Sequence, residues 1–287
     1  MTGKTPEKAH KIETPVPTRT TRDRIWKLVI IFIALVSTIP LFLILVYLVK
    51  NGIAAVNFNF LVSLPQPPGE PGGGISNAIV GTFIIIALSS LFSIPIGIFT
   101  GIYLYEYPHT RLAYLVRLCV DILQGLPSIV IGIIIWLVMV VPMKHFSALS
   151  GGVALSIMML PVIVRSTEET LNLTPFTLKE ASLALGVPYY RTIMRVVVRS
   201  GMSGILTGVL LGIARIAGET APLLFTAFGS PYMNINITKP MNTLPLLIFN
   251  YAASPYQQWH TIAWGASFVL IIFILILNII SRVVIKK

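Results

Sequence analysis

The stretch AIVGTFIIIALSSLFSIPIGIFTGIYL, residues 78–104, decides the fold class of this chain. It carries no charged side chain, and it is longer than the roughly 20 apolar residues with which a helix crosses the hydrocarbon core of a membrane. Its apolar residues run on continuously, whereas the strands of a membrane barrel alternate between apolar and polar over about ten residues. The stretch therefore predicts a membrane-spanning helix.

Five further stretches of this kind occur, so the six predicted helices cover about 25–49, 78–104, 113–141, 150–171, 203–228 and 259–281. Of the 287 residues, 55% are hydrophobic and 11% are charged, while a soluble domain carries about 25% charged residues. This composition predicts an all-α integral membrane protein. We expect residues 25–287 to form the transmembrane domain. Residues 1–24 are polar, basic and rich in threonine and proline, and we expect them to form a disordered tail.

The positive charges are divided unevenly between the two sides of the predicted membrane domain. Seventeen Lys and Arg residues lie in the N-terminal tail, between the second and third helices, between the fourth and fifth helices, and at the C-terminal end. The opposite side holds only Lys50, Lys144 and Lys239. Cytoplasmic loops carry an excess of Lys and Arg, so we expect both termini in the cytoplasm. The net charge of +11 then reflects topology in a lipid bilayer, and we expect no nucleic-acid partner.

Two classes of chemistry lack their usual residues in this sequence. The single cysteine, Cys119, excludes an internal disulfide and a multi-cysteine metal site, and the four histidines lie in tails or at helix boundaries without metal-ligand spacing. No G-x-x-x-x-G-K-[ST] phosphate-binding loop occurs in the chain. We therefore expect no metal site, and no ATP hydrolysis of that kind by this chain itself.

The predicted connection 172–202, NLTPFTLKEASLALGVPYYRTIMRVVVRSGM, differs from the other loops in its length and pattern. The pair Thr174-Pro175 suits the start of a helix, because proline is favoured in the first turn. Gly186 and Pro188 then interrupt that helix before a second, basic one begins. The connection predicts two short helices lying beneath the membrane.

The first of these short helices carries a candidate docking surface. Glu180, Ala181 and Ser182, followed by Gly186, bring a carboxylate, small residues and a hinge glycine together on the inner face. Small residues allow a partner to approach closely, and glycine allows a sharp turn. Glu180 also follows Thr177 at the spacing of a capping box. The alternative is an ordinary amphipathic connector.

Arg215 and Glu219, in ARIAGETAPLL at 214–224, place two charges inside the predicted fifth helix. Residues four apart share one face of a helix, and charges at membrane depth normally face a bundle interior or a watery path. The guanidinium fork of arginine matches phosphate. A carboxylate would accept a hydrogen bond from the P–OH group that phosphate retains at neutral pH and sulfate lacks. Our hypothesis is a phosphate-selective pair, and the alternative is a structural ion pair.

Arg165 ends the apolar run MMLPVIVR of the predicted fourth helix, shortly after Pro161. It is a candidate for a second arginine at the inner end of an anion path. The alternative is an interfacial arginine whose head group reaches water, with Glu168 or Glu169 as its partner. Arg117 and Asp121 form another pair four residues apart, and they predict a salt bridge at a helix interface; the alternative is a role in transport.

The segment EASLALG at 180–186 resembles the EAA loop of ABC-importer permeases, which docks on the ATP-hydrolysing subunit. It departs from that pattern at Ser182, which replaces an alanine, and further along at the valines 196 and 198 and at Arg199. Four other stretches are similar to the PstA-type permease subunit of the phosphate ABC importer: GGGISNAIVGTF at 72–83, LQGLPSIVIGI at 123–133, LPVIVRSTEE at 160–169 and ARIAGETAPLLFTA at 214–227. The likeness extends from about residue 72 to the C-terminus.

This resemblance implies the ABC-importer type I permease fold and a multi-pass, non-catalytic subunit of an ATP-driven phosphate importer in the cell membrane. It implies four kinds of partner: a second homologous permease, a pair of ATPase subunits, an extracytoplasmic phosphate-binding protein and inorganic phosphate. ATP and Mg would be bound by the ATPase subunits, with no cofactor in this chain. The implied substrate pathway consists of Arg215, Glu219, Thr220 and Arg165. The alternatives are a permease for molybdate or sulfate, a phosphate-signalling membrane scaffold, and a stand-alone secondary transporter.

Overall fold

A computed structural model describes residues 17–70 and 72–285 of the chain. Regular structure within these ranges is helical, apart from an isolated bridge between Phe228 and Met241. The predicted all-α class is therefore confirmed. The chain divides into two compact units, Met1–Val49 and Lys50–Lys287.

Helix α1 (Pro17–Ala55) forms the described part of the first unit and continues into the second. It covers the first predicted span and begins earlier than expected, so residues 17–24 of the predicted tail are helical. The rest of that tail, residues 1–16, lies outside the described residues. Large apolar side chains of α1, such as Phe32 and Phe42, are exposed. This exposure suits a helix surrounded by hydrocarbon.

Three long helices run through the second unit: α3 (Ser76–Glu106), α7 (Ala148–Asn172) and α14 (Gln257–Ile285). Each is long and apolar enough to cross a membrane. Glycine lets α3 and α7 approach closely, as small residues do between membrane helices. A Cβ atom added at Gly97 would lie 2.7 Å from the Ile163 side chain, and one added at Gly101 would lie 2.6 Å from that of Thr167.

The third predicted span, 113–141, is not one helix. Helix α4 (Arg111–Gly125) is bent by 105° from the helical segment that begins at Ser128. The break is at Leu126 and Pro127, because the residue before a proline is driven out of the helical region and Leu126 adopts φ −71° and ψ 133°. The segment after the break consists of α5 (Ser128–Ile135), a π-helical turn η1 (Trp136–Val140) and α6 (Val141–Met143).

The fifth predicted span, 203–228, is also interrupted. Helix α11 (Met202–Ala217) ends before Gly218, and α12 (Ala221–Thr226) begins with Pro222 in its first turn. Upstream, α11 is bent by 67° from the helical segment that ends at Ser200. That segment consists of α9 (Tyr189–Thr192), a π-helical turn η2 (Ile193–Val197) and α10 (Val198–Ser200).

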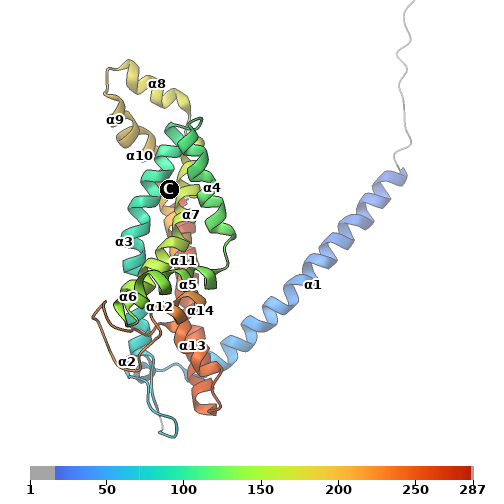
Figure 1. Ribbon diagram of the computed structural model, residues 1–287. Coiled ribbons are helices and arrows are strands. Elements are labelled where there is room, and N and C mark those ends of the chain that lie inside the picture. Colours follow the sequence, from blue (N-terminus) through green and yellow to red (C-terminus); the bar gives the residue numbers. More distant parts are fainter. Residues whose placement is uncertain (1–16, 71, 286–287) are drawn as a thin grey trace, which may run out of the picture. The chain divides into compact units, whose positions relative to one another are not determined.

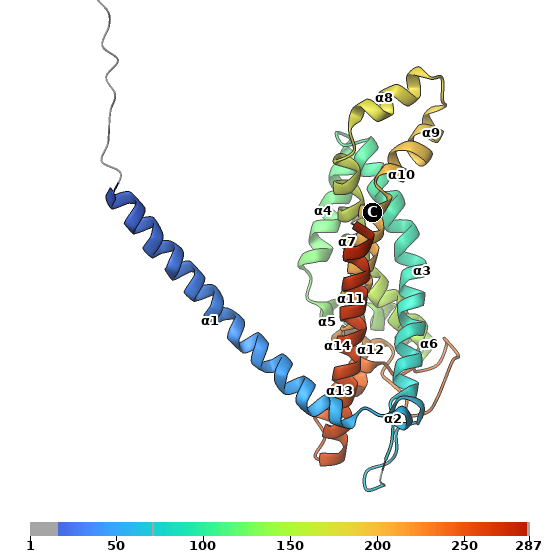
Figure 2. The same cartoon turned by 180° about the vertical axis from the view of Figure 1, so that it is seen from behind.

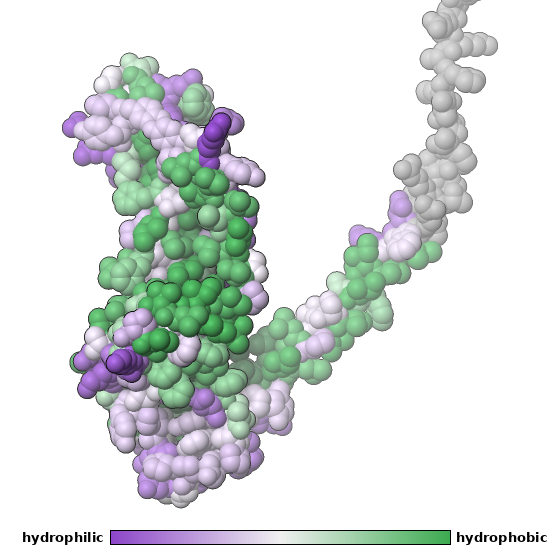
Figure 3. Space-filling view, in the orientation of Figure 1, coloured by the Kyte–Doolittle hydropathy of each residue, from purple (hydrophilic) through white to green (hydrophobic). Residues whose placement is uncertain are grey.

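The second unit is an elongated bundle with short helices at both ends (Figures 1 and 2). Helix α8 (Phe176–Ala184) and the α9–α10 segment lie at one end, which we call the α8 end. Helices α2 (Phe58–Val62) and α13 (Leu244–Ala252) lie at the other. Between them the visible face is dominated by apolar residues, and hydrophilic residues gather toward the two ends (Figure 3). This distribution is that of a protein that crosses a membrane.

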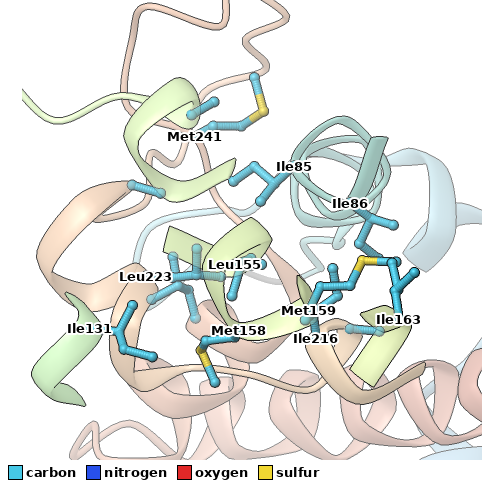
Figure 4. Close-up of a cluster of buried hydrophobic side chains, with 14 of the residues drawn as sticks. Ile85, Ile86, Ile131, Leu155, Met158, Met159, Ile163, Ile216, Leu223 and Met241 are labelled. Atoms are coloured by element: carbon cyan, nitrogen blue, oxygen red, sulfur yellow. The ribbon is translucent and has the colours of Figure 1, made fainter. Parts of the chain in front are cut away.

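The largest buried cluster holds the middle of the bundle together (Figure 4). Ile85 of α3 and Leu155 and Met159 of α7 are among its members. Ile216 and Leu223, each at most 2% exposed, belong to the same cluster. They lie on either side of the break between α11 and α12, so the core fixes both ends of that break.

Candidate functional site

Arg215 lies in the last turn of α11, on the exposed side of the helix. The next two residues, Ile216 and Ala217, are buried. A basic side chain in this position interacts favourably with the carbonyl end of the helix dipole. Arg215 therefore presents a permanent positive charge at the surface of this chain from a firmly packed turn.

Glu219 and Thr220 follow the end of α11, and both are half-buried. Because the helix ends at Ala217, the expectation that Glu219 shares a helical face with Arg215 is wrong. Among the side chains of residues 23–70 and 72–283, no ion pair joins Arg215 to Glu219. The alternative of a structural ion pair between these two residues is therefore not realised in this structure.

Four charged residues form two ion pairs, each of which joins α4 to α7. Arg117 of α4 pairs with Glu168 of α7, with Nη2 2.7 Å and Nε 2.8 Å from Oε1. Arg165 of α7 pairs with Asp121 of α4. The predicted salt bridge between Arg117 and Asp121 is therefore wrong, and the alternative in which Glu168 or Glu169 pairs with Arg165 is not realised. Each residue finds its counter-charge on the facing helix because α4 and α7 pack side by side.

The two ion pairs between α4 and α7 differ in their exposure to solvent. The side chain of Glu168 is 8% exposed and that of Arg117 is 29% exposed, whereas those of Arg165 and Asp121 are 34% and 52% exposed. Arg117 also donates to the carbonyl oxygen of Leu104, which the last turn of α3 leaves free, and to that of Pro108 in the loop after it, at 3.2 and 2.9 Å. The Arg117 pair is structural, and the Arg165 pair remains within reach of a solute.

The predicted docking residues occupy α8 and the turn after it. Glu180 and Ala181 are exposed, whereas Ser182 is buried with its hydroxyl 2.9 Å from that of Thr192 in α9. Gly186 has φ +76°, which a residue with a side chain adopts only with strain. This turn folds α8 back on α9. The predicted capping box does not form, because α8 begins after Pro175 and has no side-chain cap.

Sequence reasoning missed a half-buried polar cluster that joins α8 to α3. Lys179 Nζ lies 3.0 and 2.9 Å from the two carboxylate oxygens of Glu106 and 3.1 Å from the hydroxyl of Tyr189. Tyr189 in turn donates to Glu106. The side chains of Lys179 and Glu106 are 13% and 5% exposed. The only signal in the sequence is a single acidic residue at the end of an otherwise uncharged helix.

Two opposing effects act on the charge of Lys179. Burial lowers the pKa of Lys179, but the hydrogen bonds from its ammonium group to Glu106 and Tyr189 favour the charged form, and the pKa ends above its ordinary value. The ammonium group also lies 5.6 Å from the ring centre of Tyr105 and 5.0 Å from that of Tyr189. Glu106 and Tyr189 therefore favour the charged form of Lys179.

Comparison with known proteins places this geometry in a family. Residues 93–287 match the family described as "Binding-protein-dependent transport system inner membrane component". The chain belongs to this family. The "Phosphate transport system permease protein PstA" of Pasteurella multocida is 44% identical, over 84% of this chain and 86% of that protein. The "Probable phosphate transport system permease protein PstA" of Methanocaldococcus jannaschii is 35% identical, over 93% of this chain and 95% of that protein.

A solved structure supports the same assignment at the level of the fold. The inward-facing MetNI methionine ABC transporter in its native crystal form contains a chain that aligns with a TM-score of 0.59 at 19% identity. The alignment covers 74% of this chain and 93% of that chain. As a member of the inner-membrane component family with several membrane-crossing helices, the chain is a multi-pass protein of the cell membrane.

In this inner-membrane component, the candidate residues fall into three places. Arg215, Glu219 and Thr220 lie at the break between α11 and α12, and Arg165 lies on α7 facing α4. The docking residues lie at the α8 end. Within the described ranges, no group of three or more His, Cys, Asp or Glu side chains is placed to hold a metal ion.

Proposed function

We propose that the chain is the transmembrane permease subunit of an ATP-driven phosphate importer and forms half of its translocation pathway. The observation that carries the proposal is the set of relatives named phosphate transport system permease protein PstA. Three of them are 41–44% identical over more than four-fifths of this chain. Identity at this level along most of both chains is far stronger support than a shared fold, which hosts many functions.

The proposed pathway residues are Arg215, Glu219, Thr220 and Arg165. Arg215 is exposed on this chain alone, which suits a residue that faces a path shared with a second permease. Its charge has no counter-ion from Glu219, so it is available to an oxyanion. The exposed Arg165–Asp121 pair would let Arg165 exchange its carboxylate partner for a passing phosphate.

The proposed assembly contains a second homologous permease, a pair of ATPase subunits and an extracytoplasmic phosphate-binding protein. The chain would be non-catalytic and would hold no cofactor, with ATP and Mg bound by the ATPase subunits. Glu180, Ala181, Ser182 and Gly186 would form the docking surface for the ATPase. The exposure of Glu180 and Ala181, together with that of Leu185 at 83%, supports a surface that a partner covers.

We also propose six membrane spans with both termini in the cytoplasm. Four long helices and two bent helix pairs are apolar enough to supply these spans. The uneven distribution of Lys and Arg supports the orientation, since it puts the α8 end on the inner side.

The test is phosphate-stimulated ATP hydrolysis by the complex reconstituted in liposomes, with wild type compared with Arg215→Ala. We expect phosphate and its binding protein to stimulate the wild type, and we expect Arg215→Ala to abolish the stimulation while the complex stays assembled. Arg215→Lys keeps the charge without the planar fork and should retain part of it. Phosphate flux through liposomes that contain this chain alone would contradict the proposed function, and full stimulation of Arg215→Ala would remove Arg215 from the pathway.

A further inference from the structure

The cluster of Glu106, Lys179 and Tyr189 connects three elements that are distant in sequence. Glu106 is the last residue of α3, Lys179 lies in α8, and Tyr189 begins α9. Both carboxylate oxygens of Glu106 lie within 3.0 Å of Lys179 Nζ, and Tyr189 contacts both residues. Removal of one partner of a buried ion pair leaves an uncompensated charge, so the three side chains resist separation.

The short helices α8, α9, η2 and α10 contact one another, and we call them together the α8–α10 body. A hydrogen bond between the hydroxyls of Ser182 and Thr192 joins α8 to α9, and the chain turns sharply at Gly186 between the two helices. On the η2 and α10 side, Ile193, Val197 and Val198 belong to a buried cluster against which Ile98 and Ile102 of α3 pack. The body formed by α8, α9, η2 and α10 therefore meets α3 through apolar contacts as well as through Glu106.

Helix α3 continues this connection into the bundle. At Gly97 and Gly101 its backbone lies directly against Ile163 and Thr167 of α7. Glycine has no side chain, so no flexible group separates the two helices at these positions. These two residues of α7 flank Arg165 in the sequence. Closely packed interiors transmit a displacement because they have no free space in which to absorb it. A movement of α3 along its axis would therefore shift the turn of α7 that carries Arg165.

We propose that Glu106, Lys179 and Tyr189 form a latch that makes the α8–α10 body and α3 move together, and thereby couples the docking surface to Arg165. The proposal rests on the proposed function, and it adds to the docking surface a route by which a displacement at that surface enters the membrane bundle. Glu106, Lys179 and Tyr189 would act as positioning residues, since the role proposed for them rests on their contacts with one another. The route is contiguous, and each step of it is a contact between packed groups.

The experiment measures phosphate transported per ATP hydrolysed by the full complex reconstituted in liposomes. Lys179→Met and Glu106→Gln should each lower this ratio by at least about fivefold, the lower end of usual coupling between sites, while ATP hydrolysis continues. The exchanged pair Glu106→Lys with Lys179→Glu restores an ion pair and should recover most of the ratio. Rescue by the exchange separates coupling from a general loss of stability.

Glu169→Gln is the matched control, because it removes an exposed carboxylate in the last turn of α7, close in sequence to α8. It should leave the ratio unchanged. Where Lys179→Met fails to assemble, Tyr189→Phe removes only a hydroxyl and decides the question in the same assay. An unchanged ratio in an assembled latch variant overturns the latch alone. Failure of the wild-type complex to couple phosphate transport to ATP overturns the proposed function, whatever the variants do.

Discussion

At the scale of the residue, we expect Glu219 to set selectivity in the proposed pathway, because the structure leaves it unpaired with Arg215. A carboxylate near an anion path repels fully deprotonated oxyanions and accepts a hydrogen bond from those that keep a proton. Glu219 would therefore act on the substrate directly, instead of serving as the counter-ion of Arg215.

Glu219→Gln should admit sulfate as a competitor while phosphate uptake continues. The amide keeps an acceptor for the P–OH group, but it no longer repels a doubly charged anion. The measurement is uptake of labelled phosphate by the reconstituted complex as sulfate is increased, with Glu169→Gln as the control. Unchanged discrimination between the two anions would show that Glu219 has no selective role.

Substitutions in the two ion pairs between α4 and α7 should differ in how much they lower the stability of the protein. Asp121→Asn breaks an exposed pair, and such pairs contribute about 0–1 kcal/mol. Glu168→Gln weakens hydrogen bonds to a charged group near the protein interior, and these are worth about 1.5–3 kcal/mol. Thermal unfolding of the solubilised protein should therefore show a larger fall in Tm for Glu168→Gln. Equal shifts would contradict the assignment of a structural role to the Arg117 pair.

At the scale of the element, the contact between α3 and α7 depends on glycine. Gly101→Ala would place a Cβ atom 2.6 Å from the Thr167 side chain and 2.9 Å from the carbonyl oxygen of Val164. A backbone carbonyl cannot move aside as a flexible side chain does. We therefore expect the free energy of unfolding to fall by about 1–3 kcal/mol, as at other overpacked sites. Thermal unfolding of the solubilised protein measures it.

Gly125→Ala is the control for this substitution, because nothing lies within 4 Å of the Cβ atom that it adds. Alanine in a helix is more stable than glycine by roughly 0.5–1 kcal/mol, so Tm should stay the same or rise slightly. Equal destabilisation by the two substitutions would show that the tight contact at Gly101 does not limit the approach of the helices.

The elements also show what the sequence predicts well and what it does not. The apolar runs coincide with the four long apolar helices and with parts of the two bent helix pairs, because hydropathy depends only on local composition. Proline explains why the helix breaks at Pro127, but no local rule yields an angle of 105°. The end of α11 at Ala217 was missed, because Gly218 lies inside an apolar run whose hydropathy does not register a broken helix.

The site residues divide in a similar way. Arg215, Glu219 and Arg165 were noticeable as charges in apolar surroundings, which is a local signal. The partners of Arg165 and Arg117 were not predictable, since spacing along α4 suggested a local pair while the packing of α4 on α7 offered closer partners. The contact of Glu106 with Lys179 joins positions 73 residues apart, and only the fold brings them together.

At the scale of the whole molecule, the charge distribution predicts the orientation in the membrane. In a Cys119→Ser background, a cysteine at Leu185 should react with a membrane-impermeant thiol reagent only from the cytoplasmic side. A cysteine at Ile235 should react only from the outside. Both side chains are well exposed on this chain, at 83% and 74%, so in membranes that hold this chain without the ATPase subunits, labelling depends on sidedness. Labelling of both positions from one side would contradict the proposed six spans and orientation.

The two ion pairs that join α4 to α7 have an evolutionary consequence. Since each charge is neutralised by the facing helix, a change of sign at one position is compensated only by a change at its partner across the interface. Related sequences should therefore show covariation between positions 117 and 168 and between 121 and 165. Positions 117 and 121, although one helical turn apart, should drift independently of each other.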